Sequence, residues 1–153
     1  MGAEDAALRD RMAVEDLLIR YARAVDARDF ELVATCFTAD ARAQYAGRTL
    51  DPGVEGILSY QRQRVVRFRA SMHAVCNVSV DLKGDSAASQ CYAVAYLVMQ
   101  DGGDEVVRMR GITYSDTLLH GPRGWRIADR VHREVWMAQL PSVPPSLHGQ
   151  PPR

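Results

Sequence analysis

Hydrophobic and polar positions change their period once along this chain. Over residues 6–27, and again over residues 29–37, apolar side chains recur at helical spacing. Asp29 is placed to cap the start of the second, shorter helix. A turn signal at residues 51–53 precedes a third helix, predicted over residues 54–68. The first half of the chain is therefore predicted to be mainly helical.

After Arg69 apolar and polar residues alternate, which is typical of strands. Three segments rich in Gly, Asp or Pro separate the alternating runs and are predicted to be tight turns. Four long strands joined by turns form an antiparallel meander. The expected strands cover residues 72–82, 87–100, 106–119 and 125–137, with a short strand at 41–45 before them.

Helices followed by a mostly antiparallel sheet predict an α+β domain with the helices packed on one sheet face. Strands of this length bend, so we expect a strongly curved sheet, lidded by a helix, around an apolar pocket for a small molecule. The length suits one domain, assigned to residues 1–140. Residues 141–153 are rich in Pro, Ser and Gly and are predicted to form a disordered tail.

Composition narrows the function classes. Lys plus Arg and Asp plus Glu both number 19, so the chain lacks the charge excess that nucleic-acid or anionic-membrane binding requires. No segment has 18 consecutive apolar residues, and the N-terminus lacks the apolar run of a signal peptide. We therefore expect neither nucleic acid nor membrane as a partner, and a cytoplasmic location.

Cofactor and metal motifs are absent from the sequence. Cys36, Cys76 and Cys91 show no CxxC spacing, which argues against a disulfide framework and a zinc site. The four histidines form no ligand motif with one another, and no Gly-rich phosphate loop joins a strand to a helix. The sequence predicts no metal and no cofactor, which leaves proton-transfer chemistry.

One carboxylate lies where an apolar residue is expected. Asp26 falls within the apolar arc of the first helix, near the helix C-terminus, where the helix dipole disfavours negative charge. A partly buried carboxylate needs a partner. His73, at the start of the first long strand, could supply it, and the carboxylate would then orient the imidazole as a general base. Alternatively, Asp26 caps the turn into the second helix and His73 is a core histidine.

Several segments together resemble the SnoaL-like branch of the nuclear transport factor 2-like superfamily, over roughly residues 6–138. Within that branch the chain is most similar to cofactor-free lyases: bile acid 7α-dehydratase, scytalone dehydratase and hexachlorocyclohexane dehydrochlorinase. The segments that carry the resemblance are Tyr21 with Asp26, residues 71–77 around His73, the turn at residues 83–87, and residues 124–130.

The resemblance implies a cone-shaped α+β barrel with a deep apolar pocket and a catalytic dyad of His73 and Asp26. It also implies that Tyr21, which matches a pocket tyrosine of the dehydratases, donates a hydrogen bond to the substrate. Arg130 matches a pocket arginine that stabilises developing negative charge. From the residues alone, Tyr21 could equally be a core residue, and Arg130 could form a structural ion pair with Asp116 or Asp129.

These expectations combine into a cofactor-independent lyase or isomerase of the dehydratase type, acting on an apolar polyketide-, terpenoid- or steroid-like molecule. The alternatives are a non-catalytic ligand-binding or assembly subunit, and a polyketide cyclase or hydrolase, on the same fold. The chain is expected to form a homodimer or homotrimer. His120 and His132 are expected to face solvent. Residues expected to contact substrate are Val75, Asn77 and Trp136.

Overall fold

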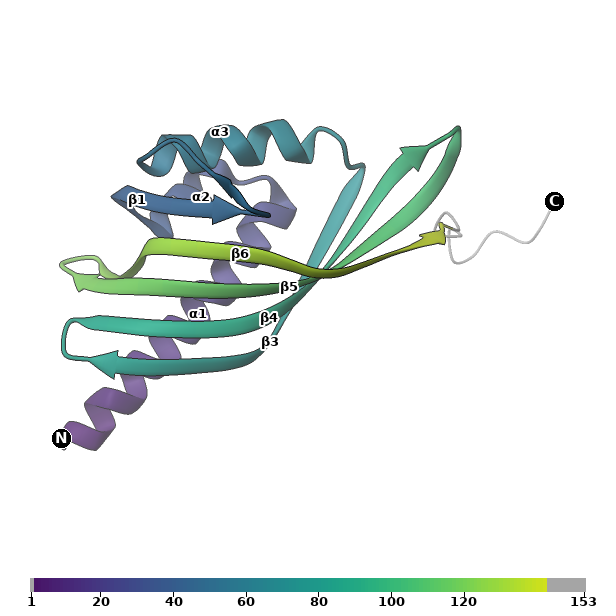
Figure 1. Cartoon of the computed structure of the whole chain (residues 1–153). Helices are drawn as coiled ribbons and strands as arrows, with labels where there is room; N and C mark the ends of the chain where they lie inside the picture. The colour runs from purple at the N-terminus through teal and green to yellow at the C-terminus, as the bar shows by residue number, and fades with distance from the viewer. Residues whose placement is uncertain (1, 143–153) are drawn as a thin grey trace, which may run out of the picture.

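The computed structural model describes residues 2–142, which fold into three helices and a six-stranded sheet (Figure 1). The helices lie in the first half of the chain and the long strands in the second, which confirms the predicted α+β class. The helices are α1 (Ala3–Ala27), α2 (Phe30–Thr35) and α3 (Val54–Val65). The strands are β1 (Phe37–Tyr45), β2 (Arg48–Thr49), β3 (Ala70–Lys83), β4 (Ser86–Asp101), β5 (Asp104–Gly121) and β6 (Gly124–Pro141).

The sheet has the strand order β2-β1-β6-β5-β4-β3. The predicted meander is present as β3 to β6, in which every neighbouring pair is antiparallel. β1 extends the sheet by pairing in parallel with β6. The sheet is strongly curved and not closed, and α1 crosses behind it (Figure 1). The curvature leaves a hollow between the sheet and the helices.

Several element ends differ from the expected ones. α2 ends at Thr35 and β1 begins at Phe37. Phe37, the expected last residue of the second helix, is therefore the first residue of a strand. Asp29 does cap α2, because its carboxylate accepts a hydrogen bond from the Leu32 N–H at 2.9 Å. β6 continues to Pro141, where the tail was expected to begin. The remainder of that expected tail, residues 143–153, lies outside the described part of the chain.

α1 packs its apolar arc onto the sheet. Val14, Leu17 and Leu18 are almost completely buried in the core. The helix ends at Arg28, whose backbone is left-handed with φ of 58°, and whose guanidinium donates a hydrogen bond to the Phe68 carbonyl. This contact ties the end of α1 to the segment that leads into β3, so Asp26 lies beside the first residues of β3.

Register shifts in the sheet, two of them between β5 and β6, change which side chains face the hollow. In β6, Thr117 pairs with Asp129 and Leu118 pairs with Ile127, so Ala128 is an extra residue. Another register shift lies in β3 after Cys76. Because side chains alternate between the two faces of a strand, one extra residue reverses the facing expected for the residues that follow, up to the next register shift.

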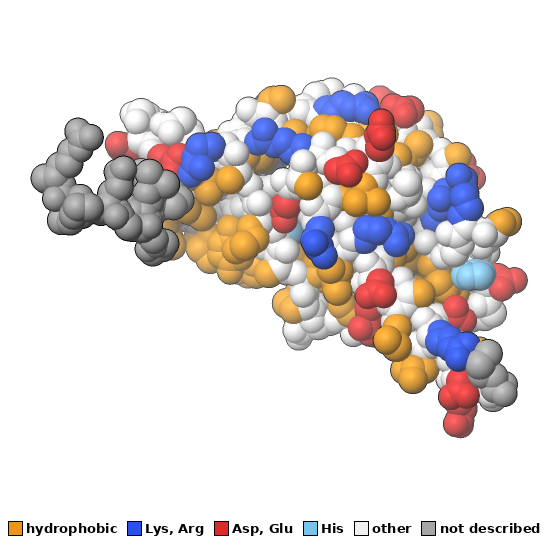
Figure 2. Space-filling model, turned by 180° about the vertical axis from the view of Figure 1, so that it is seen from behind, with side chains coloured by type: hydrophobic (Ala, Val, Ile, Leu, Met, Phe, Trp, Pro, Cys, Tyr) orange, Lys and Arg blue, Asp and Glu red, His pale blue; other side chains and the backbone are white. Residues whose placement is uncertain are grey.

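Basic and acidic side chains are interspersed over the face that carries the helices, whereas apolar side chains gather near the end of β6 (Figure 2). Among residues 2–142, no helix is both long enough and apolar enough to cross a membrane.

Candidate active site

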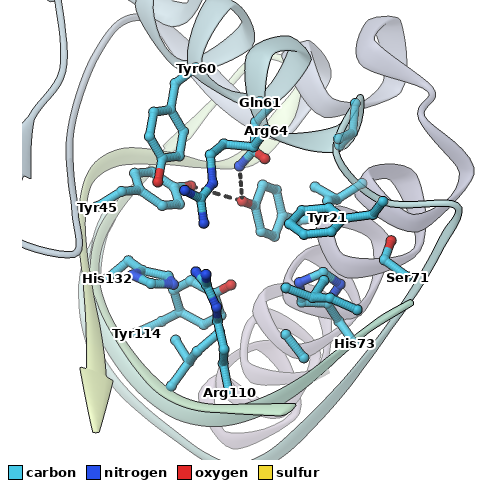
Figure 3. Close-up of a pocket in the computed structure, with 16 residues that line it drawn as sticks. Tyr21, Tyr45, Tyr60, Gln61, Arg64, Ser71, His73, Arg110, Tyr114 and His132 are labelled. Atoms are coloured by element: carbon cyan, nitrogen blue, oxygen red, sulfur yellow. Dashed lines mark hydrogen bonds between the residues drawn. The ribbon is translucent and has the colours of Figure 1, made fainter. Parts of the chain in front are cut away.

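The hollow contains a cavity of about 60 Å³ bounded by α1, α3 and five strands of the sheet. Figure 3 shows His73 and Ser71 on one side, His132, Tyr114 and Arg110 across from them, and side chains of α3 over the top. The lining residues are Tyr21, Val25, Tyr45, Tyr60, Gln61, Arg64, Val65, Phe68, Ser71, His73, Ala95, Leu97, Arg110, Ile112, Tyr114 and His132. The cavity is therefore lined by aromatic, basic and amide groups as well as by apolar ones.

Asp26 and His73 meet at the edge of this cavity. The His73 Nδ1 lies 2.6 Å from Asp26 Oδ1, and the His73 backbone N–H donates to Asp26 Oδ2 at 2.7 Å. The Ser71 hydroxyl donates to Asp26 Oδ1 at 2.8 Å. Three hydrogen bonds from one strand therefore hold the carboxylate in place, and its side chain is only 20% exposed.

These contacts decide which nitrogen of His73 carries the proton. Partial burial raises the pKa of Asp26, but the hydrogen bonds and charge of His73, together with Ser71, lower it by more, so its pKa lies below the ordinary value. A carboxylate can only accept, so His73 Nδ1 carries the hydrogen. In the neutral imidazole the lone pair is then on Nε2, as a general base requires. The side chain of His73 retains 13% exposure, so the ring is accessible.

Tyr21 lines the cavity from α1. Its hydroxyl lies 2.8 Å from the Tyr45 hydroxyl and accepts a hydrogen bond from Gln61 Nε2 at 2.9 Å (Figure 3). Burial, with Tyr45 and Tyr114 nearby, raises the pKa of Tyr21 well above its ordinary value, although Arg130 lowers it. The hydroxyl groups of Tyr21 and Tyr45 carry one hydrogen each. One of the two hydrogens forms the hydrogen bond between the tyrosines, so the other remains available to a ligand.

Arg130 is not among the residues that line the cavity. It is completely buried, and its Nε and Nη2 donate to the two carboxylate oxygens of Asp116 at 2.8 and 2.6 Å. Its guanidinium stacks 4.2 Å from the centre of the Tyr21 ring and 4.3 Å from that of Tyr114. Of the two expectations for Arg130, the structure shows the ion pair with Asp116, and the residue supports the aromatic wall from behind.

The three expected substrate contacts do not line the cavity. Val75 packs against the core cluster. Asn77 is exposed in the β3 bulge with φ of 53°, a left-handed conformation that Asn tolerates better than most residues. Trp136 lies on the other face of the sheet, over Gly111, where an added Cβ would meet its indole nitrogen at 2.1 Å.

His132 was expected to face solvent, and this is wrong, because the residue is 7% exposed and lines the cavity. Trp125 and Ile127 face inward, so strict alternation turns His132 outward. The extra residue Ala128 reverses that facing. The ring stacks on Tyr45 at 5.0 Å between centroids. His120, by contrast, is exposed as expected.

Sequence reasoning also missed the basic groups of the cavity, Arg64 on α3 and Arg110 on β5. Arg110 stands two residues before Ile112 and four before Tyr114, which are both buried. That two-residue spacing is the signal that could have assigned Arg110 to the inner face.

Among residues 2–142, no group of three or more His, Cys, Asp or Glu side chains has an arrangement that could hold a metal ion. Cys36 and Cys91 are buried and Cys76 is exposed, and none of the three is in a disulfide. Burial raises the pKa of the Cys91 thiol to about 11, so it is not poised as a nucleophile. The groups able to move protons in the cavity are His73 and the tyrosines.

Residues 6–131 match the SnoaL-like domain. The chain belongs to this family. It is 31% identical over 140 residues to uncharacterized proteins of Mycobacterium tuberculosis (strain H37Rv) and Mycobacterium bovis, and the alignment covers 88% of this chain and 92% of each relative. The resemblance drawn from Tyr21, Asp26 and His73 to the SnoaL-like branch is thereby confirmed at the level of the family.

Solved structures share the fold of this SnoaL-like domain. A type 2 hexachlorocyclohexane dehydrochlorinase (LinA) has a TM-score of 0.83 at 16% identity, covering 97% of this chain and 100% of that one. A protein of Novosphingobium aromaticivorans provisionally assigned as a scytalone dehydratase has a TM-score of 0.80 at 18% identity, covering 97% and 99%. At these identities the likeness establishes the cone-shaped fold alone.

Proposed function

We propose that this SnoaL-like protein is a cofactor-independent lyase or isomerase that removes a proton from carbon with His73. The observation that carries the proposal is the contact of 2.6 Å between His73 Nδ1 and Asp26 Oδ1 at the edge of an accessible cavity. A positioned base of this kind contributes roughly 10²–10⁴-fold to a rate.

The proposed reaction begins when Nε2 of His73 takes a proton from a carbon next to a carbonyl group. Asp26 orients the ring and stabilises the imidazolium that forms. The electron pair of the broken C–H bond moves toward the carbonyl, whose oxygen gains negative charge and accepts the free hydroxyl hydrogen of the Tyr21–Tyr45 pair.

The intermediate can go forward in two ways. In a dehydration, a β-hydroxyl group takes the proton from the imidazolium and leaves as water while a C=C bond forms. In an isomerisation, the imidazolium returns the proton to a different carbon. His73 is neutral again at the end of both reactions, so neither reaction needs a cofactor to supply or remove protons or electrons.

The size of the cavity bears on the substrate. At about 60 Å³ it is smaller than the roughly 150 Å³ cavity that holds benzene in a well-studied protein. A complete steroid nucleus is larger than this space. The space therefore favours a small molecule, or one end of a larger molecule, over the steroid-like substrate considered from sequence.

A non-catalytic member of the fold remains the second candidate, because this fold serves many functions. That reading expects Asp26 and His73 to lie out of hydrogen-bond reach, or the hollow to be filled by side chains. The first expectation disagrees with the measured contact, whereas the small cavity agrees in part with the second. Catalysis is therefore favoured by the contact between His73 and Asp26.

The test is a panel of small β-hydroxy ketones, esters and acids incubated with the protein in D₂O and followed by proton NMR. Replacement of C–H by C–D reports proton abstraction, and new alkene signals report dehydration. We expect the wild type to accelerate at least one member, and His73→Asn to lower that rate by about 10²–10⁴-fold.

The matched control is Arg62→Gln, an exposed residue of α3 that pairs with Glu55 at 3.7 Å. It should react at the wild-type rate. Circular dichroism must show that His73→Asn is folded. A folded His73→Asn variant at the wild-type rate, or a wild type inert toward the whole panel, would contradict the proposal.

A further inference from the structure

Two arginines face the same cavity without a carboxylate between them. Arg64 of α3 and Arg110 of β5 both line it, and none of the sixteen lining residues is Asp or Glu. Figure 3 shows their side chains extending into the cavity from opposite sides. Like charges that share a partly buried space repel each other unless an anion lies near. This unbalanced charge needs an explanation.

Arg64 has no ion-pair partner within 4.0 Å among residues 2–142. Its guanidinium lies 5.9 Å from the centre of the Tyr60 ring. Its place in the last turn of α3 gives one structural reason for a positive charge, because cations stabilise helix C-termini. That reason applies equally to Arg62 in the same turn, which is more exposed and has its own carboxylate, Glu55. Arg62 is therefore a natural comparison residue.

Arg110 is more buried, with 16% of its side chain exposed. Glu134 lies 3.5 Å from its Nη1, and its buried Nε has no hydrogen-bond acceptor. Burial lowers the pKa of Arg110 and Glu134 raises it, while the positive charges of Arg64 and Arg108 lower it further, so the net shift is downward. An anionic group in the cavity would relieve the repulsion between the two guanidinium groups.

His132 adds a neutral donor beside these charges. Burial lowers its pKa to about 4, so the ring is neutral at physiological pH. Its Nδ1 accepts a hydrogen bond from the Ala46 backbone N–H at 3.3 Å. A neutral imidazole whose Nδ1 accepts carries its hydrogen on Nε2. His132 is thus a hydrogen-bond donor in the cavity, across from the base His73 (Figure 3).

We propose that the cavity binds its substrate through a carboxylate group held between Arg64 and Arg110, with His132 Nε2–H as an additional donor. This inference rests on the proposed function and names the substrate class of that same site. A carboxylate is favoured over a phosphate because it is planar, fits a guanidinium with two parallel hydrogen bonds, and occupies less of a cavity of about 60 Å³. The acyl chain then extends toward His73.

The test compares crotonate with crotonamide, which has nearly the same shape and no charge. Dissociation constants are measured by NMR titration of the ¹⁵N-labelled full-length protein at low ionic strength and pH 7. We expect crotonate to bind at least about tenfold more tightly than crotonamide. Arg64→Gln and Arg110→Gln should each reduce crotonate affinity by about tenfold or more and leave crotonamide affinity nearly unchanged.

Two control variants separate this inference from the proposed function. Arg62→Gln removes one positive charge from the same helix turn and should retain the preference for crotonate. His73→Asn removes the proposed base and should also retain it. If crotonate binds as expected but no panel member reacts, the lyase proposal fails and the carboxylate site stands.

Three outcomes would overturn the carboxylate site. Equal affinities for crotonate and crotonamide would show that charge is not recognised. Unchanged crotonate affinity in Arg64→Gln, which is partly exposed and tolerates substitution better than Arg110, would show that the cavity arginines do not hold the anion. Tighter binding of inorganic phosphate than of crotonate would assign the site to a different class of anion.

Discussion

His73 and His132 line one cavity from opposite sides, but their Nδ1 atoms meet different partners. His73 Nδ1 faces the carboxylate of Asp26 at 2.6 Å, whereas His132 Nδ1 accepts from the Ala46 backbone N–H at 3.3 Å. The first ring therefore carries its hydrogen on Nδ1 and the second on Nε2. The same side chain is prepared as a base on one side and as a donor on the other.

This difference shows that the chemistry of a histidine is assigned by the group behind it. Neither ring is distinguished by residue type or by the strand face it occupies. A carboxylate behind the ring stabilises the imidazolium that forms when Nε2 takes a proton. A backbone N–H behind the ring offers no such stabilisation, and burial of His132 holds its pKa near 4. Only His73 therefore has a partner that stabilises its protonated ring.

The largest expected change in the difference between the two histidines comes from removing the positive charge of Arg130, near His132. The positive charge of Arg130 helps to lower the pKa of His132, after the larger effect of burial. Arg130→Met should raise that pKa, as measured by NMR titration. It should also lower the free energy of unfolding by about 3–5 kcal/mol in urea, because Asp116 would remain buried and unpaired.

The double variant Arg130→Met/Asp116→Leu is the control for this prediction. Replacing both charges with apolar side chains should recover most of the lost stability. A loss below about 1 kcal/mol in the single variant would indicate that the pair is not the structural support described here.

The next largest effect concerns pH and His132. The unfolded chain takes up a proton near the ordinary pKa of 6.5, but the folded His132 does so only near pH 4. Between these values the unfolded state binds more protons, so the free energy of unfolding should fall by up to about 3 kcal/mol as the pH is lowered. Urea unfolding of wild type and His132→Gln from pH 7 to pH 4.5 measures this slope. An equal slope in both proteins would refute the assignment.

The smallest of the three effects sharpens the role of Asp26. In Asp26→Asn the imidazolium of His73 loses its negative partner, so the rate of proton abstraction should fall by about hundredfold, or about 2.7 kcal/mol. The lowered pKa of Asp26 makes its contribution to stability present above the ordinary value of 3.8 and lost as the pH falls through the folded value.

Two measurements test that variant. The difference in unfolding free energy between wild type and Asp26→Asn should shrink below about pH 4, as Asp26 of the wild type becomes protonated. ¹⁵N chemical shifts should show the hydrogen of His73 on Nδ1 in the wild type and redistributed in Asp26→Asn, with His132 unchanged. Unaltered shifts of His73 would exclude a role of Asp26 in orienting the ring.

The order of helices and strands could be predicted from sequence because it follows from local periodicity and turn residues. The Asp26–His73 contact could also be predicted, since a carboxylate on an apolar helix arc is costly without a partner. Tyr21 and Asp26 lie about 140° apart around an ideal helix, so they would point in different directions from α1. Both can serve one cavity because the sheet curves around the helix. Tyr21 reaches the cavity directly, and Asp26 reaches it through His73.

Contacts that depend on register could not be predicted from the same patterns. Alternation along β6 predicted that His132 faces outward. This prediction failed because the composition of the strand does not reveal the extra residue Ala128. Asn77 was expected to face the pocket for the same reason, since the β3 bulge begins beside it. The family resemblance implied that Arg130 is a pocket residue. Only its contact with Asp116 in the structure shows that it lies behind the aromatic residues of the cavity and does not line the cavity itself.

The bulge at Ala128 determines which of the following side chains of β6 face the cavity. Deleting Ala128 would place Asp129 directly after Ile127, so Asp129 would still pair with Thr117, and Arg130 and His132 would stay on the buried face. Regular pairing that included Ala128 would instead bury Asp129 and Val131. The local pairing at Ala128 therefore decides, together with residue identity, which side chains form this wall.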